Sequence, residues 1–159
     1  MDTEQFIDGP CPIGRGLHRI GDSWSMLILR NAGAGQTRFD QFQKSLGIAP
    51  NILTRRLTAL TREGLLERRR YSEKPPRDEY LLTTAGRDFL PVLYALGAWG
   101  ARHFSDGAVT ALADASSGAP VRPMVIDRNS GRRLAEMELR LEQPAAAPHD
   151  TAQIASSNR

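Results

Sequence analysis

Cysteine is almost missing from this chain of 159 residues, since Cys11 is the only one. A single thiol cannot form an intrachain disulfide, and we therefore expect a protein of the reducing cytoplasm. No spacing typical of metal ligands, no phosphate-binding loop and no paired carboxylates stand out either. The sequence therefore predicts no metal and no cofactor.

A convincing catalytic pair is also missing. Cys11 and His18 offer a nucleophile and a base, but the two residues lie on one predicted helix. At about 1.5 Å per residue they are about 10 Å apart along its axis, too far for a hydrogen bond. His103 and His149 are remote in sequence. We expect that the protein is not an enzyme.

Long hydrophobic runs are missing as well. The longest weakly apolar stretch, residues 90–101, is shorter than the roughly 20 residues that cross a bilayer. The first ten residues are acidic and have neither the basic nor the apolar region of a signal peptide. We therefore expect a cytoplasmic protein without membrane contact.

Positive charge is concentrated rather than abundant. The whole chain has 21 basic and 18 acidic residues, a net charge of +3. Residues 51–78 contain eight basic and four acidic side chains, so this segment alone carries 8 − 4 = +4. The excess permits binding to a polyanion such as DNA without requiring it.

The apolar spacing predicts five helices before residue 105. Cys11 is expected to cap the first, with Pro12 at its first position, and the second spans about residues 22–31. A short helix within residues 37–46 is closed by Gly47, and the next runs from Pro50 to a stop at Gly64. The last, over about residues 85–104, is expected to be capped by Thr83 or Thr84. It carries more apolar surface than a small domain can bury, which indicates a subunit interface.

Two strands are predicted between the last two helices. Residues 65–71 and 79–83 read as antiparallel partners, and Pro75 and Pro76 belong at the turn because proline cannot donate a ladder hydrogen bond. Two short helices joined by a tight turn, then a β-hairpin and a helix, are typical of a winged helix-turn-helix. The second helix of the pair is the one that such domains place in the major groove of DNA.

The composition changes after residue 104. Residues 1–10 are interpreted as an arm, 11–104 as the DNA-binding and dimerisation domain, 105–120 as a linker and 143–159 as a disordered tail. In residues 121–142, alternation from Ala135 to Leu141 after Asn129-Ser130-Gly131 predicts a C-terminal β-hairpin, although the spacing of Leu134, Met137 and Leu141 also fits a helix. No internal repeat is evident. The predicted fold is mainly α with a small β-hairpin wing, dimeric, with this hairpin as an appendage.

Several motifs of the chain, in order, resemble the HxlR family of bacterial transcription factors, winged-helix relatives of the MarR type. These are Cys11-Pro12, GDSWSMLILR, RFDQF, LTRRLTALTREGLLERRRY, PPRDEYLLTTAGRDF and Trp99. The likeness covers about residues 11–104. It implies a homodimer built by the N-terminal and last long helices, which reads a two-fold operator. It also implies, for some members, sensing of electrophiles or oxidants through the N-terminal cysteine, and for others a small-molecule effector.

Two positions depart from the family pattern. Ala49 stands where relatives tend to have serine, and the lost side-chain cap typically costs about 1 kcal/mol, which Pro50 partly offsets. Asp78 stands where an apolar residue is common, and it is expected to dilute the positive charge of the wing. The residues after Phe104 lie outside the resemblance.

The candidate DNA contacts lie on the helix after Pro50 and on the wing. The face opposite Leu53, Leu57 and Leu60 is expected to read bases, because asparagine pairs with adenine and arginine with guanine. Its residues are Asn51, Thr54, Arg55 and Thr58. Contacts to the DNA backbone are expected from Arg38, Arg56, Lys74 and Arg77. The alternative for each group is an ordinary solvated face or hairpin tip.

Cys11 is the candidate redox sensor. The N-terminus of a helix favours a thiolate, and Arg15 adds positive charge one turn on. The alternative is an inert cysteine at a dimer contact. The predicted dimer interface contains Ile13, Leu17, Leu93, Leu96 and Trp99.

The function predicted from these residues is a homodimeric repressor that binds an inverted-repeat operator on double-stranded DNA. An electrophile, an oxidant or a small ligand is expected to relieve it. The alternative is a winged-helix module for protein–protein contact, in which the basic hairpin meets an acidic partner and no specific operator exists.

Overall fold

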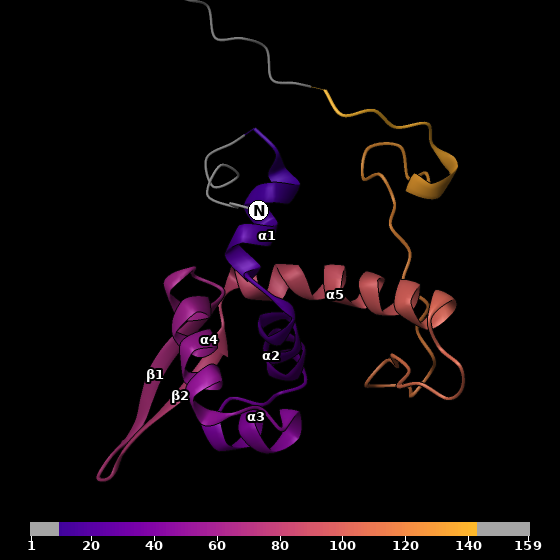
Figure 1. The fold of residues 1–159 in the computed structure, drawn as a ribbon. Coiled ribbons are helices and arrows are strands. Elements are labelled where there is room, and N and C mark those ends of the chain that lie inside the picture. The colour runs from indigo at the N-terminus through magenta and orange to yellow at the C-terminus, as the bar shows by residue number, and fades with distance from the viewer. Residues whose placement is uncertain (1–9, 143–159) are drawn as a thin grey trace, which may run out of the picture.

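The computed structural model describes residues 10–142 of the chain. Five α-helices precede and follow one two-stranded sheet (Figure 1). The predicted N-terminal arm lies outside the described residues except for Pro10, and so does the predicted tail at 143–159. No helix in the described part of the chain is long and apolar enough to cross a membrane.

The first two helices begin at side-chain caps. In α1 (Pro12–Ile20), Cys11 is the N-cap and Pro12 occupies the first turn, as predicted. In α2 (Ser23–Gly33), the carboxylate of Asp22 accepts a hydrogen bond from the backbone N–H of Ser25 at 3.0 Å. These caps satisfy backbone donors that the helix itself leaves unpaired, which fixes where each helix starts.

The predicted helix-turn-helix consists of α3 (Phe39–Leu46) and α4 (Pro50–Arg62). Gly47 ends α3 in the left-handed conformation, with φ of 62°, which glycine adopts without a steric penalty. Ala49 is the N-cap of α4 and makes no side-chain cap bond, while Pro50 starts the helix. The tight turn between the helices follows from these few residues.

The wing is formed by β1 (Leu66–Glu73) and β2 (Pro76–Leu82). The two strands are antiparallel, Arg70 pairs with Asp78, and Glu73 pairs with Pro76. The turn therefore consists of Lys74 and Pro75, and Pro76 already belongs to the second strand. The expected turn at the two prolines is displaced by one residue, and this changes which side chains face each other across the sheet.

The last helix, α5 (Thr84–His103), starts at the predicted cap Thr83, whose hydroxyl accepts from the N–H of Gly86. Gly86 is buried where the helix passes the strands, and a Cβ there would lie 2.2 Å from the backbone oxygen of Leu65. Only glycine permits this approach. The C-terminal half of α5 projects beyond the helix-turn-helix (Figure 1).

The core joins α2, α3, α4 and the start of the wing. Its fully buried members include Ile28, Leu29, Phe42, Leu53 and Leu57. Among the described residues, the core and the half-buried hydrophobic residues packed against it all lie between Ile20 and Leu93. The fold therefore agrees with the predicted winged helix-turn-helix, and its packing is complete before the C-terminal segment begins.

The C-terminal segment differs from the expected hairpin over residues 121–142. A turn forms at the predicted Asn129-Ser130-Gly131, but pairing is limited to an isolated bridge between Ile126 and Arg133. The chain then enters a 3-10 turn, η2 (Leu134–Glu136), and continues without a described strand partner. The alternating residues 135–141 have an apolar face, but residues 10–142 form no sheet that buries it.

Candidate nucleic-acid interface

Helix α4 presents one buried and one exposed face. Leu53, Leu57 and Leu60 lie in the core, with at most 1 % of their surface exposed. The four residues predicted to read bases are all exposed on the other side of the helix: Asn51, Thr54, Arg55 and Thr58. The spacing of leucines, four and three residues apart, thus predicted the orientation of this helix correctly.

Two of these four side chains make local hydrogen bonds. The Oδ1 atom of Asn51 accepts from the N–H of Ile52 at 2.9 Å, and the hydroxyl of Thr54 donates to the carbonyl of Pro50 at 2.9 Å. Arg55 has no hydrogen-bonding or ion-pairing side-chain partner in the described chain. Its guanidinium retains five donors for an external acceptor.

Arg56 takes a different place from the one expected. Its side chain is only 30 % exposed, and its guanidinium forms an ion pair with Asp22, the residue that caps α2. Its Nε atom is buried and has no hydrogen-bond partner among the described residues. Arg56 thereby joins the start of α2 to the middle of α4. The sequence reading placed Asp22 at the start of the second helix without naming it as a cap, and its approach to Arg56 depends on how the two helices pack.

Three charged residues of the wing form a cluster, which we call the hairpin charge cluster: Arg68, Arg70 and Asp78. The Nε atoms of both arginines donate to the Asp78 carboxylate at 2.9 Å. These hydrogen bonds, first from Arg70 and then from Arg68, lower the pKa of Asp78, and the same bonds raise the pKa of both arginines. The cluster neutralises part of the basic charge that the sequence places in the wing.

Arg69 points to the other face of the hairpin, as strand alternation requires. Its guanidinium forms an ion pair with Glu79, with 2.8 Å between Nη2 and Oε1. The three consecutive arginines are therefore all paired with acids of β2. The sequence interpretation had set Asp78 against Lys74 and Arg77, whereas the register places it opposite Arg70.

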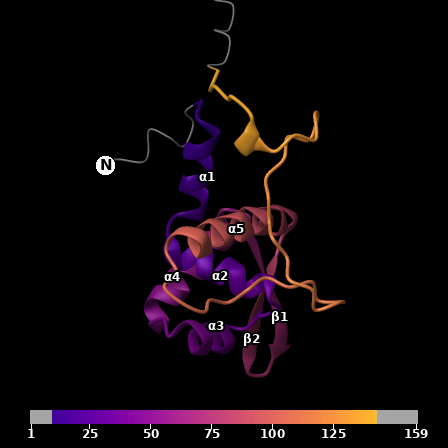
Figure 2. The same ribbon diagram turned by 90° about the vertical axis from the view of Figure 1, so that its right-hand side faces the viewer.

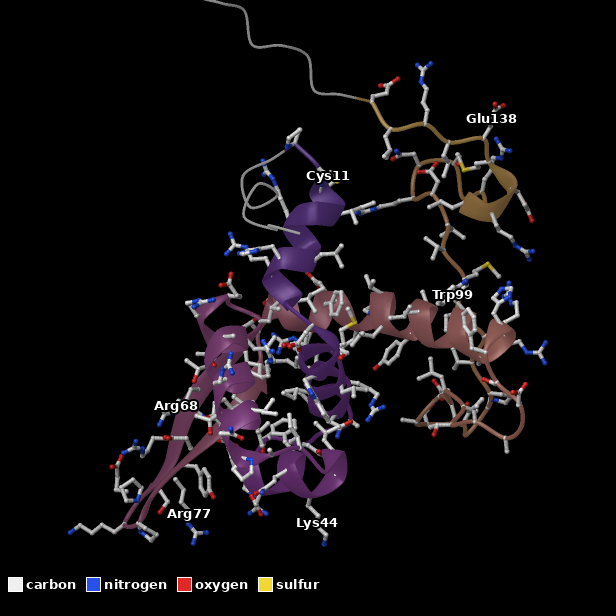
Figure 3. All side chains as sticks on the ribbon, viewed as in Figure 1. Cys11, Lys44, Arg68, Arg77, Trp99 and Glu138 are labelled. Atoms are coloured by element: carbon white, nitrogen blue, oxygen red, sulfur yellow. The ribbon has the colours of Figure 1, made fainter. Side chains whose placement is uncertain are left out.

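Lys74 and Arg77 are the cations of the wing that remain without a side-chain partner in the described part of the chain. Both are exposed, and Lys74 occupies the turn itself. Arg77 lies toward the far end of the hairpin (Figure 3). These two residues keep the positions that the sequence assigned to them.

A groove of about 550 Å³ separates the wing from the start of α3. Arg38 and Arg77 line it from the two sides, together with Tyr71, Tyr80 and the two acidic residues Asp40 and Asp78. Arg38 also lies 3.4 Å from the carboxylate of Asp40, measured from its Nε atom. The groove thus brings together two cations predicted separately, from elements 39 residues apart.

The wing is held against the helix pair at this groove. The N–H of Tyr80 donates to the carbonyl of Thr37 at 2.7 Å, and Arg38 forms an isolated bridge with Glu79. Burial raises the pKa of Tyr80. Tyr71, 44 % exposed, belongs to this surface and was not predicted from the sequence. The position of this aromatic residue directly after three arginines in the sequence could have indicated that it belongs to the same surface.

Cys11 occupies the helix N-terminus as expected. It is partly buried, and its Sγ atom accepts from the N–H of Gly14 at 3.5 Å. The sulfur is therefore the cap of α1 and remains partly accessible. Its place is far along the chain from the exposed face of α4, and Figure 3 shows it on the opposite side of the domain from Arg77.

Four of the five residues predicted for the dimer interface are exposed in the single chain. Their exposed fractions are Ile13 61 %, Leu17 57 %, Leu96 45 % and Trp99 53 %. Leu93 instead packs against the core. Trp99 stacks edge-on with Phe104, with ring centroids 4.9 Å apart, near the end of α5. Apolar surfaces of this kind are uncommon on a monomer.

Known proteins similar to this chain are transcriptional regulators. The family model for the HxlR-like helix-turn-helix matches residues 19–107. An uncharacterized HTH-type transcriptional regulator of Mycobacterium tuberculosis is 36 % identical over 147 residues, which cover 91 % of each chain.

Solved structures are similar over different lengths. The crystal structure of PA1607, described as a candidate transcription factor, has a TM-score of 0.78 and 40 % identity over 88 % of this chain and 99 % of that one. The oxidized form of the redox regulator HypR has a TM-score of 0.55 and 30 % identity over 60 % of this chain and 99 % of that one. The likeness to PA1607 extends well beyond the winged helix, whereas the likeness to HypR covers about as many residues as the winged-helix domain alone.

Proposed function

This chain belongs to the HxlR-like helix-turn-helix family of transcriptional regulators, and we propose that it is a cytoplasmic repressor that binds an inverted-repeat operator as a homodimer. The observation that carries the proposal is the groove between α3 and the wing, where Arg38 and Arg77 face a common space. A phosphate backbone is the polyanion that such a groove beside an exposed helix face would accept.

The bases would be read by the exposed face of α4. Arg55 has its guanidinium free of partners in the described chain, and it would donate to a guanine. Asn51, near the start of the helix, would exchange its local bond for a pair of bonds to adenine. Thr54 and Thr58 would contact bases or thymine methyl groups through the same face.

The backbone would be held by Arg38, Lys74 and Arg77, with the docked hairpin as a stiff support. Arg56 leaves this group, because its ion pair with Asp22 occupies its guanidinium within the protein. The paired arginines of β1 would contribute little unless DNA displaces their carboxylates. Three cations per subunit therefore remain for phosphates.

The homodimer would form through the exposed apolar residues of α1 and α5. Helix α1 and the C-terminal half of α5 lie away from the tip of the wing, which leaves the two α4 faces available for two half-sites about one helical turn, 34–36 Å, apart. A closed two-fold dimer matches an inverted repeat because each subunit meets the same sequence.

The test is an electrophoretic mobility-shift titration of the full chain on fragments of its own upstream DNA, at several salt concentrations. The expected result is tight binding to one fragment that contains an inverted repeat, and at least 10³-fold weaker binding to the others. Equal affinity for all fragments that disappears at moderate salt would refute specific regulation. It would favour the protein–protein module instead.

Two variants separate the two kinds of contact. Arg55→Ala is expected to cost about 1–3 kcal/mol on the operator and to reduce the preference among sequences. Lys74→Ala is expected to weaken binding to all sequences similarly and to lower the salt slope by about one unit. Equal, sequence-independent losses from both variants would contradict this division.

Cys11 would carry an oxidant or electrophile signal. The support is its partly accessible sulfur at the start of α1, beside the proposed interface, and the likeness to a regulator named for redox control. As the only cysteine, it could form an adduct, a mixed disulfide or a bridge to the second subunit. Diamide or a quinone is expected to weaken operator binding of the native chain and not of Cys11→Ser. Unchanged binding in both would leave Cys11 a structural cap, with a small ligand as the remaining candidate effector.

A further inference from the structure

Residues 105–142, which we call the arm, leave the end of α5 and rise beside the domain to the level of α1 (Figures 1 and 2). The backbone hydrogen bonds described for the arm join its residues to one another. Its large apolar side chains are exposed: Val125 by 53 %, Leu139 by 61 % and Leu141 by 86 %. The arm therefore has an apolar surface that its own domain does not cover.

The arm is nevertheless ordered, because it contains the same turn twice. The carboxylate of Asp114 accepts from the N–H of Ser117 at 2.8 Å, and that of Asp127 accepts from the N–H of Ser130 at 2.9 Å. Asp114 donates its own N–H to the carbonyl of Ala119, as Asp127 does to Arg132.

The backbone hydrogen bonds that flank each turn repeat as well. The N–H of Val121 donates to the carbonyl of Leu112, and the N–H of Leu134 donates to that of Val125, so these bonds recur 13 residues later. This corrects the expectation that the chain has no internal repeat. Each turn is closed by a glycine in the left-handed conformation, Gly118 and Gly131. Two self-contained turns make the arm preorganised, which reduces the conformational entropy lost when it docks.

The charge of the arm argues against DNA as its partner. It contains five basic residues and six acidic ones, so its net charge is 5 − 6 = −1. A nearly neutral segment with exposed valines and leucines fits an apolar protein surface instead. The chain itself offers such a surface in the exposed residues of α1 and α5.

The position of the arm is shared with a solved protein. The likeness to PA1607 spans 88 % of this chain, about 140 of 159 residues, whereas only 104 residues precede the arm. The likeness therefore includes much of the arm. Support from another chain would explain why a segment with so little contact with its own core is also matched in a crystal structure. Since every copy carries both an arm and an apolar face, two copies can support each other in one closed two-fold arrangement.

We propose that the arm is exchanged between the two subunits of the dimer and docks on the apolar faces of α1 and α5 of the second copy. The inference rests on the homodimer proposed above and goes beyond it, because it assigns the partner of a segment outside the family domain. Burial of Val125 and Leu139 would then add to the interface that α1 and α5 provide.

The experiment is photo-crosslinking of the full chain with p-benzoyl-phenylalanine in place of Val125. Two differently tagged copies are mixed, irradiated and separated by mass. The expected product has twice the mass of one chain, carries both tags and joins the arm to a peptide of α1 or α5. The matched control places the same group at the exposed Arg128, in the second turn, and is expected to give at least fivefold less of that product.

The outcomes are distinct. A link within one chain would overturn the exchange, because the arm would then cover its own domain. A link between two arms would overturn the proposed docking site. The absence of any link would also overturn it, provided that sedimentation shows a dimer and that the protein binds its operator. A monomer without operator binding would refute the proposed function itself.

A second variant measures the contribution of the arm. Val125→Asp in the full chain is expected to weaken dimerisation at least tenfold in analytical ultracentrifugation, while Arg128→Asp in the turn is expected to leave it unchanged. Because Val125 lies outside the core, the domain should remain folded in both variants. Equal dimer affinities for the two variants would contradict the docking of this side chain.

Discussion

The ion pair between Asp22 and Arg56 gives the sharpest test of how this domain is held together. One carboxylate both caps α2, through the N–H of Ser25 at 3.0 Å, and binds the guanidinium of Arg56 on α4. The two side chains are 26 % and 30 % exposed, so solvent screens the pair only in part. Substitutions at Asp22 can separate the two roles.

Asp22→Asn keeps an oxygen for the cap and removes the charge. A hydrogen bond to a charged group contributes about 1.5–3 kcal/mol, and partial exposure reduces this to an expected loss of about 1–2 kcal/mol. Asp22→Ala also removes the cap, which adds about 1 kcal/mol, for a total of about 2–3 kcal/mol. Arg56→Ala should cost about as much as Asp22→Asn.

The assay is urea unfolding of each single variant and of the Asp22→Asn, Arg56→Ala double variant at one protein concentration, since dimerisation makes stability depend on concentration. The double variant should be about 1 kcal/mol more stable than the sum of the two losses predicts. If the losses add to within about 0.3 kcal/mol, Arg56 is free in solution. Arg56→Ala should then lower the salt slope of DNA binding as Lys74→Ala does, and the phosphate contact first expected for it would return.

Three further perturbations test other parts of the structure. Asp78→Asn releases both arginines of the hairpin charge cluster, and it should steepen the salt dependence of non-specific DNA binding by about one to two units per subunit; an unchanged slope would mean that these arginines face away from DNA. Hydrogen bonds from two serines lower the pKa of Asp114 to about 2, so the first turn of the arm should be stable above about pH 4 and lose that stability as the pH falls toward 2. NMR titration of its carboxyl carbon checks this, and an ordinary midpoint near 3.8 would contradict the turn. Gly86→Ala should destabilise the fold by about 1–3 kcal/mol in urea unfolding because its Cβ meets backbone, whereas Gly97→Ala, in open space on the same helix, should be neutral or slightly stabilising.

Local chemistry explains what the sequence predicted well. Cys11 and Thr83 cap their helices, Pro50 starts α4, and Gly47 ends α3, because each acts through bonds to residues no more than four positions away. The exposed face of α4 followed from the leucine spacing for the same reason. These features need no knowledge of how distant segments meet.

The partners of the arginines could not be predicted in this way. Arg56 meets Asp22 only because α2 packs against α4, a contact between residues 34 positions apart. The pairing of Asp78 depends on the register of the hairpin, which the sequence reading did not predict. Register and helix packing are set by the whole core rather than by either segment.

The arm shows a different limit. The repeated Asp-x-x-Ser-Gly pattern was present in the sequence, at Asp114 and again at Asp127, but only the hydrogen bonds show that both copies form one kind of turn. Alternation of apolar residues was read as a strand because a strand buries one face. In the described chain this apolar face stays exposed. In the proposed dimer, a second chain would bury it.

Salt dependence connects these findings to function. The four predicted backbone contacts and the three consecutive arginines of β1 make seven basic side chains that could bind phosphates: Arg38, Arg56, Arg68, Arg69, Arg70, Lys74 and Arg77. In a dimer they would give a slope of about −13 at about −0.9 per phosphate. Ion pairs with other helices or strands engage four of the seven, and Arg38 has an exposed pair with its neighbour Asp40. If DNA releases that exposed pair, the six remaining cations of a dimer give about −5. The pairs therefore limit the non-specific attraction of the wing for any DNA, and they leave a larger share of the binding free energy to the sequence-reading face of α4.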